Sequence, residues 1–220
     1  MTQPPPVRTA LLAGATGAVG SALLTQLLAD ARYGMVKVLV RRPLGISHQK
    51  LVELTLSDSG PALLGAKLLA DDVFCCLGTT QKKAGSRAAF ERVDYHLVLE
   101  LARAALAQGA QQFLVVSSVG AALKGASFYL RVKARMEQAV LDLGYQSAHI
   151  LRPSLLIAKR RESRRVEWLA QKLAPLVDPL LQGKLGIYRT ARAEDVAAAM
   201  LTLALRQTPG GHTHHLPLAA

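Results

Sequence analysis

The glycine-rich segment near the N-terminus limits what this chain can fold into more than any other feature. Gly14, Gly17 and Gly20 follow a short apolar stretch, residues 7–13, and open a stretch with helically spaced leucines, residues 18–29. Strand, glycine turn and helix in this order bring a backbone without Cβ atoms to the first turn of a helix. The free N–H groups and the positive end of the helix dipole there attract a phosphate. The pattern therefore predicts the pyrophosphate site of a dinucleotide.

Short apolar strand candidates alternate with helical segments along the rest of the chain. Strands are expected at residues 35–40, 51–56, 73–77, 112–116 and 147–151, and helices at 86–108, 127–143 and 191–205. This alternation predicts an α/β Rossmann fold, a doubly wound parallel sheet with its ligand crevice at the carboxyl ends of the strands. We expect one domain over residues 1–220. Residues 154–190 break the alternation and are expected to form a small lid-like extension toward the substrate.

The second predicted strand ends at two arginines. In a dinucleotide fold this point lies near the adenosine ribose, where NAD-binding proteins usually carry an acid that accepts a hydrogen bond from the 2′-hydroxyl. Arg41 and Arg42 stand there instead. A guanidinium forms charge-assisted, often bidentate bonds with a phosphate. The sequence therefore favours NADP(H) over NAD(H).

Composition limits the partners and the location. A net charge of +12 favours an anionic partner without identifying it. Basic residues are not interleaved with aromatic ones, which makes nucleic acid an unfavoured partner. No apolar run approaches the roughly 20 residues of a membrane span, and the N-terminus lacks a secretory signal. Adjacent cysteines, Cys75 and Cys76, fit a reducing compartment. We therefore expect a cytoplasmic protein, monomeric or dimeric.

A tyrosine and a lysine form the centre of a candidate catalytic set. Tyr129 and Lys133 are four residues apart in a predicted helix, so their side chains lie on one face. Ser117 and Ser118 end the preceding strand. In such a set Lys133 stabilises a phenolate and holds ribose hydroxyls, Tyr129 exchanges a proton, and a serine orients a carbonyl. We favour Ser118 as that serine because a turn follows it, whereas Ser117 could face the core.

Further stretches extend this pattern over nearly the whole chain. They are Arg41-Arg42-Pro43, Phe74-Cys75-Cys76-Leu77-Gly78-Thr79-Thr80, Val93-Asp94-Tyr95, Leu151-Arg152-Pro153 and Arg161-Glu162-Ser163-Arg164. With the glycine turn and the tyrosine–lysine pair, they resemble the Tat-interactive-protein-like branch of the atypical short-chain dehydrogenase/reductases. The serine-to-tyrosine gap of 11 or 12 residues is slightly shorter than is usual in that superfamily.

The resemblance implies an NADPH-binding domain with assigned contacts. Leu77 and Gly78 would line the adenosine and ribose side, Tyr129 would be the proton donor or acceptor, and Lys133 would hold the nicotinamide ribose. Arg152 and Pro153 would flank the nicotinamide end. The full set expected to contact the cofactor is Gly14, Thr16, Gly17, Ala18, Val19, Gly20, Arg41, Arg42, Leu77, Gly78, Ser117, Tyr129, Lys133, Arg152 and Pro153.

Two functions agree with this sequence. The first is an NADP(H)-dependent oxidoreductase that reduces an unidentified carbonyl compound. The second is a non-catalytic NADP(H)-binding regulatory or assembly protein, in which residues 159–186 meet a protein partner, because dinucleotide folds serve many functions. An epimerase or lyase is less favoured, since only about 65 residues after Pro153 are left for a substrate lobe.

Three further features are expected to be structural. The last dozen residues are expected to form a short strand or a tail. His212, His214 and His215 lack an accompanying cysteine or carboxylate, so we expect a flexible tail there rather than a metal site. Asp71 and Asp72 are expected to form a turn. Trp168 has helical spacing with neighbouring leucines and is expected in the core.

Overall fold

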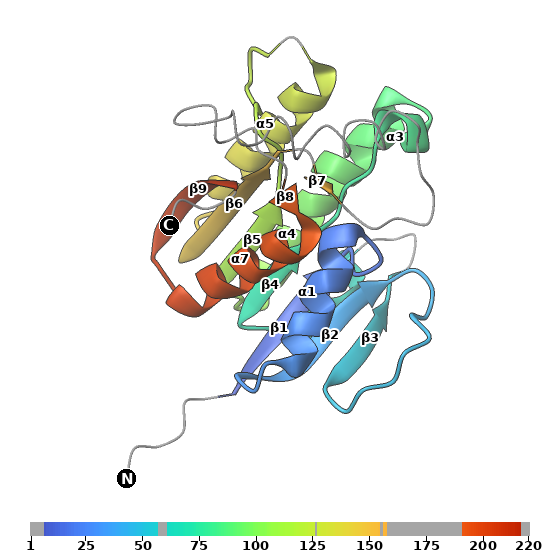
Figure 1. Cartoon of the computed structure of the whole chain (residues 1–220), viewed down its shortest axis with the longest axis vertical. Helices are drawn as coiled ribbons and strands as arrows, with labels where there is room; N and C mark the ends of the chain where they lie inside the picture. Colours follow the sequence, from blue (N-terminus) through green and yellow to red (C-terminus); the bar gives the residue numbers. More distant parts are fainter. Residues whose placement is uncertain (1–6, 57–60, 126, 155, 158–190, 217–220) are drawn as a thin grey trace.

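A parallel seven-stranded sheet forms the centre of the protein. The computed structural model describes residues 7–56, 61–125, 127–154, 156–157 and 191–216 (Figure 1). The strands of the sheet are β1 (Arg8–Ala13), β2 (Tyr33–Val40), β3 (Leu51–Thr55), β4 (Asp72–Cys75), β5 (Gln112–Val116), β6 (Ser147–Pro153) and β9 (Gly210–Leu216). Their order is β3-β2-β1-β4-β5-β6-β9, and every pairing is parallel. The chain winds outward in both directions from β1, which confirms the predicted doubly wound α/β fold.

Helices cover both faces of this sheet (Figure 1). The long ones are α1 (Ala18–Ala29), α4 (Leu97–Ala107), α5 (Phe128–Leu141) and α7 (Ala193–Arg206). The core under α1 and α7 is separate from the core under α4 and α5. Successive residues of β1 enter the two cores alternately, since Ala10 and Leu12 lie in the first and Leu11 and Ala13 in the second. A strand buried on both faces must be apolar throughout, which explains the continuous apolar run in the sequence.

Shorter elements connect the strands. They are η1 (Pro61–Leu68), α2 (Gln81–Ala84), α3 (Arg87–Glu91), η2 (Arg92–His96), and a separate pair of parallel strands, β7 (Leu156–Ile157) and β8 (Ala191–Arg192). The single helix predicted over residues 86–108 is in fact α3, the π-helical turn η2 and α4 in succession. A π turn adds a residue and changes which side chains face inward. Asp94 lies in this turn and is fully buried.

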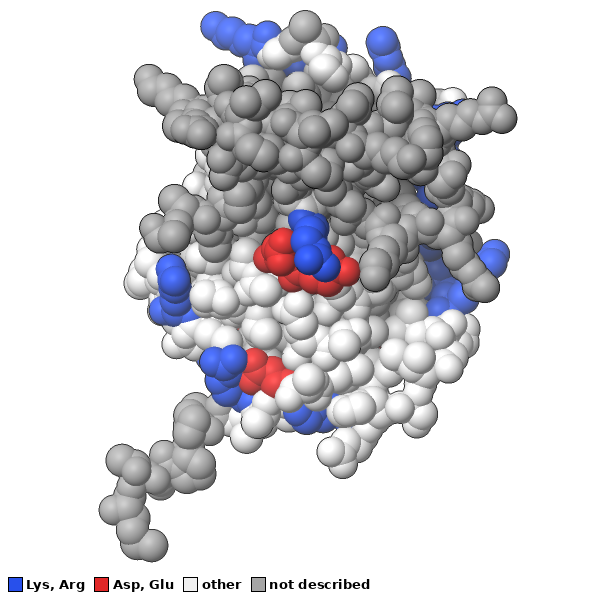
Figure 2. Space-filling view, viewed as in Figure 1, with Lys and Arg blue, Asp and Glu red and all other residues white. Residues whose placement is uncertain are grey.

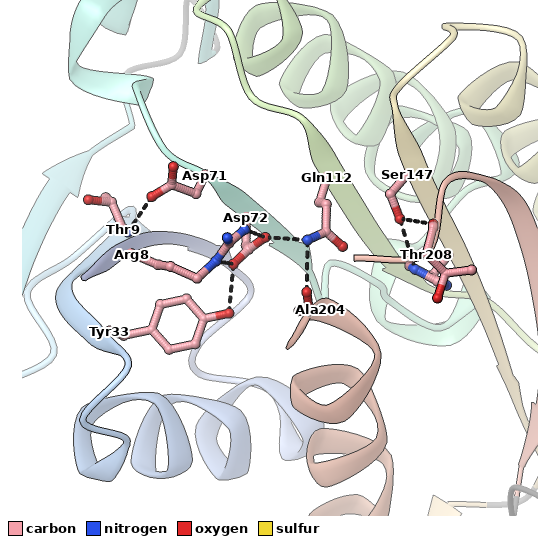
Figure 3. A network of polar contacts seen from close by, with 10 residues as sticks. Arg8, Thr9, Tyr33, Asp71, Asp72, Gln112, Ser147, Ala204 and Thr208 are labelled. Atoms are coloured by element: carbon pink, nitrogen blue, oxygen red, sulfur yellow. Dashed lines mark hydrogen bonds and ion pairs between the residues drawn. The ribbon is translucent and has the colours of Figure 1, made fainter. Parts of the chain in front are cut away.

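Asp72 is a buried carboxylate at the amino-terminal edge of the sheet, where it joins several elements (Figure 3). Arg8 of β1 donates to both carboxylate oxygens, at 2.7 and 2.6 Å. Tyr33 of β2 donates at 2.7 Å and Gln112 of β5 at 2.9 Å. Gln112 also donates to the carbonyl of Ala204 in α7 at 2.8 Å. One side chain of β4 thus ties three strands and a helix to its own strand.

The turn predicted at Asp71 and Asp72 is therefore wrong for the second residue. Asp72 is the first residue of β4, whereas Asp71 is exposed and accepts a hydrogen bond from the backbone N–H of Thr9 at 2.7 Å. Burial, together with the charge of Asp72, raises the pKa of Tyr33, so the phenol stays a donor to the carboxylate.

The histidines near the C-terminus lie in β9, so the short strand that was one alternative for this end is confirmed and the flexible tail expected for the histidines is wrong. In β9, His212 lies beside His149 of β6, and His214 beside Leu151. His149 Nδ1 lies 2.9 Å from His214 Nε2, and the rings of His149 and His212 stack with centroids 5.1 Å apart. Cross-strand pairing could not be read from the local sequence, because β6 and β9 are far apart along the chain.

The hydrogen bonds of Ser147 fix the protonation of His149. Ser147 Oγ donates to the carbonyl of Thr208 at 2.7 Å (Figure 3). It also lies 3.0 Å from His149 Nε2. Because the hydroxyl hydrogen is used by Thr208, His149 Nε2–H donates to Ser147 and His149 Nδ1 accepts from His214. Burial and the neighbouring His214 and His212 lower the pKa of His149 to about 4.

Replacement of Asp72 by asparagine is predicted to destabilise the fold strongly. The change leaves Arg8 without its charge partner and places an amide hydrogen among donors, and breaking a buried ion pair costs about 3 kcal/mol or more. Urea denaturation measures the difference. The matched control is Asp71→Asn, which alters one exposed hydrogen bond and should cost less than about 1 kcal/mol. Equal costs for the two variants would contradict the structural role of Asp72.

Stability is predicted to fall in mild acid because of His149. Its folded-state pKa lies below the unfolded value, so the unfolded chain binds the proton more readily. The stability that neutral His149 gives the folded protein is complete above about pH 6.5 and is lost as the pH falls toward 4. Between pH 7 and 5 the free energy of unfolding should drop by roughly 1–2 kcal/mol more in the native protein than in His149→Gln.

Urea denaturation at the two pH values measures this difference, with His48→Gln as the control. His48 is exposed and lies outside the cluster, so that variant should keep the full drop. The interpretation is wrong if His149→Gln and the native protein lose equal stability in acid.

Candidate functional site

The glycine turn joins β1 to α1 at the carboxyl-terminal edge of the sheet. Gly14 has a φ of +87°, and a Cβ there would lie 2.5 Å from the carbonyl oxygen of Cys76. A Cβ at Gly20 would lie 2.1 Å from the carbonyl oxygen of Gly14. Gly17 is the N-cap residue of α1, and it has no side chain to cap the helix. The close approach requires glycine, and the first N–H groups of α1 are left for an anion, which fits a dinucleotide phosphate.

The neighbouring residues of the turn differ in burial. Thr16 is exposed and Ala18 is half-buried. Val19 packs its side chain into the core under α1 and α7. Its contact with a ligand would therefore be through the backbone N–H, as expected for a residue in the first turn of a helix.

Two more segments reach the same edge of the sheet. The loop after β4 starts against the glycine turn, because the N–H of Cys76 donates to the carbonyl of Ala13 at 2.8 Å. Leu77 and Gly78 continue this loop. Arg41 and Arg42 directly follow β2, the neighbour of β1 on its other side, and both side chains are exposed. The parallel sheet thus brings the predicted pyrophosphate, ribose and 2′-phosphate contacts to one edge.

Lys133 of α5 forms a buried ion pair in this region. Its Nζ lies 2.8 Å from Asp94 Oδ1, and the two side chains are 4% and 1% exposed. Nζ also lies 3.5 Å from the carbonyl of Val116 at the end of β5. Burial opposes the charged form of Lys133, but the charge and hydrogen bond of Asp94 and the neighbouring Tyr129 raise its pKa above the ordinary value. The lysine is therefore an ammonium at neutral pH.

Tyr129 lies one helical turn before Lys133 and is half-buried. Its ring centroid is 5.5 Å from that of Phe90, which in turn lies 6.0 Å from the ring of Phe128. The guanidinium of Arg87 lies 5.1 Å from the centre of the Phe128 ring. An aromatic cluster thus supports the phenol ring of Tyr129 from α3.

The two serines at the end of β5 have different environments. Ser117 is buried and donates to Glu137 of α5, whereas Ser118 is half-buried and its hydroxyl lies 3.3 Å from the carbonyl of Val119. Arg152 of β6 donates to both carboxylate oxygens of Glu137, at 3.0 and 2.5 Å. Ser117 and Arg152 are thus both held by one buried carboxylate.

These contacts affect the roles that the sequence predicted for the two serines and Arg152. Because Ser117 is directed at α5, Ser118 is the serine with a half-exposed hydroxyl. Arg152 was expected to flank the nicotinamide end of a cofactor; its guanidinium is engaged by Glu137, and Pro153 next to it is buried. A cofactor contact of either residue stays a prediction.

Sequence reasoning named Asp94 only as part of the family resemblance, without a role, and missed Glu137. Glu137 is one turn after Lys133, so helical spacing alone places it on the same face of α5. Asp94 stands among helically spaced apolar residues, where an acid usually signals a buried partner. The identity of both partners required the fold. The predicted lid, including residues 159–186 and Trp168, lies almost wholly outside the described residues.

In the described residues, neither the charged side chains nor the potential metal ligands form a second functional site. Lys and Arg side chains are dispersed over the face shown in Figure 2, and some adjoin acidic side chains. Within the described parts of the chain, no three His, Cys, Asp or Glu side chains are arranged to hold a metal ion. In the same parts, no helix is long and apolar enough to cross a membrane.

The fold and the glycine turn define a Rossmann-type NAD(P)-binding protein related to the short-chain dehydrogenase/reductases. Residues 14–205 match the model of the NAD(P)H-binding family, and the chain belongs to that family. The chain is 36% identical to Protein HTATIP2 of Rattus norvegicus, over 75% of this chain and 69% of the relative. The predicted resemblance to the Tat-interactive-protein-like branch is confirmed.

Two other comparisons extend this result. Protein FMP52-1, mitochondrial, of Scheffersomyces stipitis is 32% identical over 71% of this chain and 70% of its own length. Among solved structures, MoeE5 in complex with UDP-glucose and NAD shares the fold with a TM-score of 0.69. It is 20% identical, and the match covers 94% of this chain and 75% of MoeE5.

The expected cytoplasmic location is contradicted by these relatives. Several fungal relatives carry the designation mitochondrial in their names. The sequence argument rested on a missing secretory signal, a missing membrane span and reduced cysteines. A mitochondrial protein shares all three properties, so the argument could not separate the two locations.

Proposed function

We propose that this protein is an NADP(H)-dependent reductase of a carbonyl compound. The observation that carries the proposal is a charged Lys133 one helical turn from a half-buried Tyr129, at the sheet edge that also holds the glycine turn. Both side chains lie on α5, which packs against the end of β5 through the contact of Lys133 with Val116.

The cofactor residues follow the path of a dinucleotide along that edge. The N–H groups of Ala18 to Gly20 would bind the pyrophosphate, and Leu77 with Gly78 would line the adenosine and ribose side. Arg41 and Arg42 would pair with a 2′-phosphate, which distinguishes NADP(H) from NAD(H). The fold neighbour MoeE5 was solved with NAD, which supports a dinucleotide in this fold.

The catalytic roles divide among three side chains. When bound, a nicotinamide would supply the hydride. Tyr129 would then give its phenolic proton to the developing alkoxide oxygen of the substrate, and Ser118 would orient the carbonyl with its hydroxyl. Lys133 would donate to the ribose hydroxyls and stabilise the phenolate left on Tyr129 by its charge.

A cofactor-binding regulator is the second candidate. The pairing of Lys133 with Asp94 supports it, because a lysine neutralised in this way stabilises a phenolate less. In that case, the protein would bind NADPH, turn over no carbonyl compound, and capture a partner only in the presence of cofactor.

Calorimetry is predicted to show a preference for NADPH over NADH that depends on the arginines. Loss of charge-assisted bonds to a 2′-phosphate costs about 1.5–3 kcal/mol, so Arg41→Ala combined with Arg42→Ala should weaken NADPH binding about 10- to 100-fold and leave NADH binding nearly unchanged. Arg32→Ala is the matched control. Arg32 precedes the same strand at its other end and pairs with Asp30. Equal affinity of the native protein for both cofactors would overturn the assignment.

Tyr129→Phe is predicted to lose turnover and to keep the cofactor. Removal of a general acid lowers the rate about 10²- to 10⁴-fold, whereas the ring contacts with Phe90 remain. NADPH oxidation with a panel of aldehydes and ketones measures the rate, and calorimetry measures binding. Tyr95→Phe, whose ring contacts Arg135 outside the proposed machinery, is the control. Turnover retained in Tyr129→Phe excludes the proposed proton donor, and no turnover by the native protein favours the regulator.

A further inference from the structure

The buried pair of Asp94 and Lys133 joins two parts of the candidate site. Asp94 Oδ1 lies 2.8 Å from Lys133 Nζ, and Asp94 Oδ2 accepts a hydrogen bond from the backbone N–H of Thr79 at 2.8 Å. One carboxylate therefore contacts both α5 and the loop that follows β4. That loop starts at the glycine turn, so Asp94 connects Lys133 to the predicted cofactor path.

The position of Asp94 depends on the π-helical turn η2. This turn interrupts the helix between β4 and β5, and π turns often occur at functional sites. The carboxylate has no exposure to solvent, so water does not stabilise its charge. Its stabilising contacts are the ammonium of Lys133 and the N–H of Thr79.

A buried lysine without a counter-charge loses its proton more easily than an exposed one. Taking an ammonium out of water favours the neutral amine, and a carboxylate at hydrogen-bond distance reverses that preference. For Lys133 the balance favours the ammonium, because its pKa is raised despite burial. Asp94 is the group that contributes most to keeping the charge that would bind a ribose hydroxyl.

Gly78 of the loop after β4 adjoins this ion pair. A Cβ at that position would lie 3.5 Å from Asp94 Oδ1 and 3.9 Å from Lys133 Nζ. The loop predicted to contact the cofactor therefore lies directly against the pair.

We propose that Asp94 is a positioning residue that keeps Lys133 charged and fixed, together with the Gly78–Thr79 loop, as one unit that receives the nicotinamide ribose. The proposal rests on the proposed function, since it assumes that Lys133 serves the cofactor. Asp94 itself acts through Lys133 and Thr79. Its replacement should change the pH dependence of cofactor binding, which a merely structural carboxylate would leave unchanged.

The first test follows the ionisation of Lys133 in the native protein without cofactor. Lysine labelled with ¹³C at Cε reports the charge of Nζ by NMR, and Lys133→Arg identifies the signal. Lys133 should keep its ammonium at a higher pH than exposed lysines such as Lys124. A signal that titrates below those of the exposed lysines overturns the proposal, and this result depends neither on replacing Asp94 nor on turnover.

The second test uses Asp94→Asn, which removes the charge and retains an oxygen for Thr79. Lys133 should then titrate at lower pH than in the native protein. NADPH affinity of the variant should be close to native at pH 6 and about tenfold weaker at pH 9, whereas the native protein changes little over this range. Glu91→Gln, which removes an acid from α3 paired with Arg135, should behave as the native protein.

The outcomes separate this proposal from the proposed function. Uniformly weaker binding at every pH, with the Lys133 titration unchanged, would assign Asp94 a structural role and overturn the inference. Loss of the Lys133 charge with unaltered NADPH binding would also overturn it. Absence of carbonyl turnover would remove the proposed reductase activity, but both the NMR titration and the pH dependence of binding would stand.

Discussion

The carboxylate of Asp72 is the contact on which the arrangement of the sheet depends. It lies at the amino-terminal edge of β4 and receives hydrogen bonds from β1, β2 and β5, and Gln112 extends the network to α7. A buried charge is tolerated only when its partners surround it completely, so these strands have one favourable register. Because they are parallel, fixing their amino ends also fixes where their carboxyl ends meet. The candidate site lies at those ends.

Two further ion pairs, both near the candidate site, also tie one element to another. Lys133 and Glu137 are one turn apart on α5, and each is neutralised by a residue from another element, Asp94 from η2 and Arg152 from β6. Unpaired, either group would oppose the packing of α5 on the sheet. Once paired, these residues fix the position of α5 relative to the sheet, and the position of Tyr129 is fixed with it. The position of the candidate proton donor thus depends in part on Asp94 and Glu137, which do not exchange its proton.

Membership in the NAD(P)H-binding family and the Rossmann fold agree on a dinucleotide ligand. They leave the reaction to the side chains at the sheet edge, because one fold serves many functions. The half-buried phenol and the charged lysine favour proton transfer near a ribose. The arginines after β2 favour a phosphorylated ribose at the other end of the ligand. These two features, rather than the glycine turn, carry what is particular to this protein.

Local sequence determined the glycine turn, most of the strand and helix positions, the two arginines after β2 and the spacing of Tyr129 and Lys133. Each is set by interactions between residues close in the chain, or by the apolar period of a buried element. Only the tertiary structure decided that Asp72 is a core carboxylate, that Asp94 and Glu137 neutralise Lys133 and Arg152, and that the C-terminal histidines belong to a strand. The partners of these residues are 15 to 65 residues away in the chain. A side chain's burial and charge partner depend on which elements pack together, and no local pattern encodes that choice.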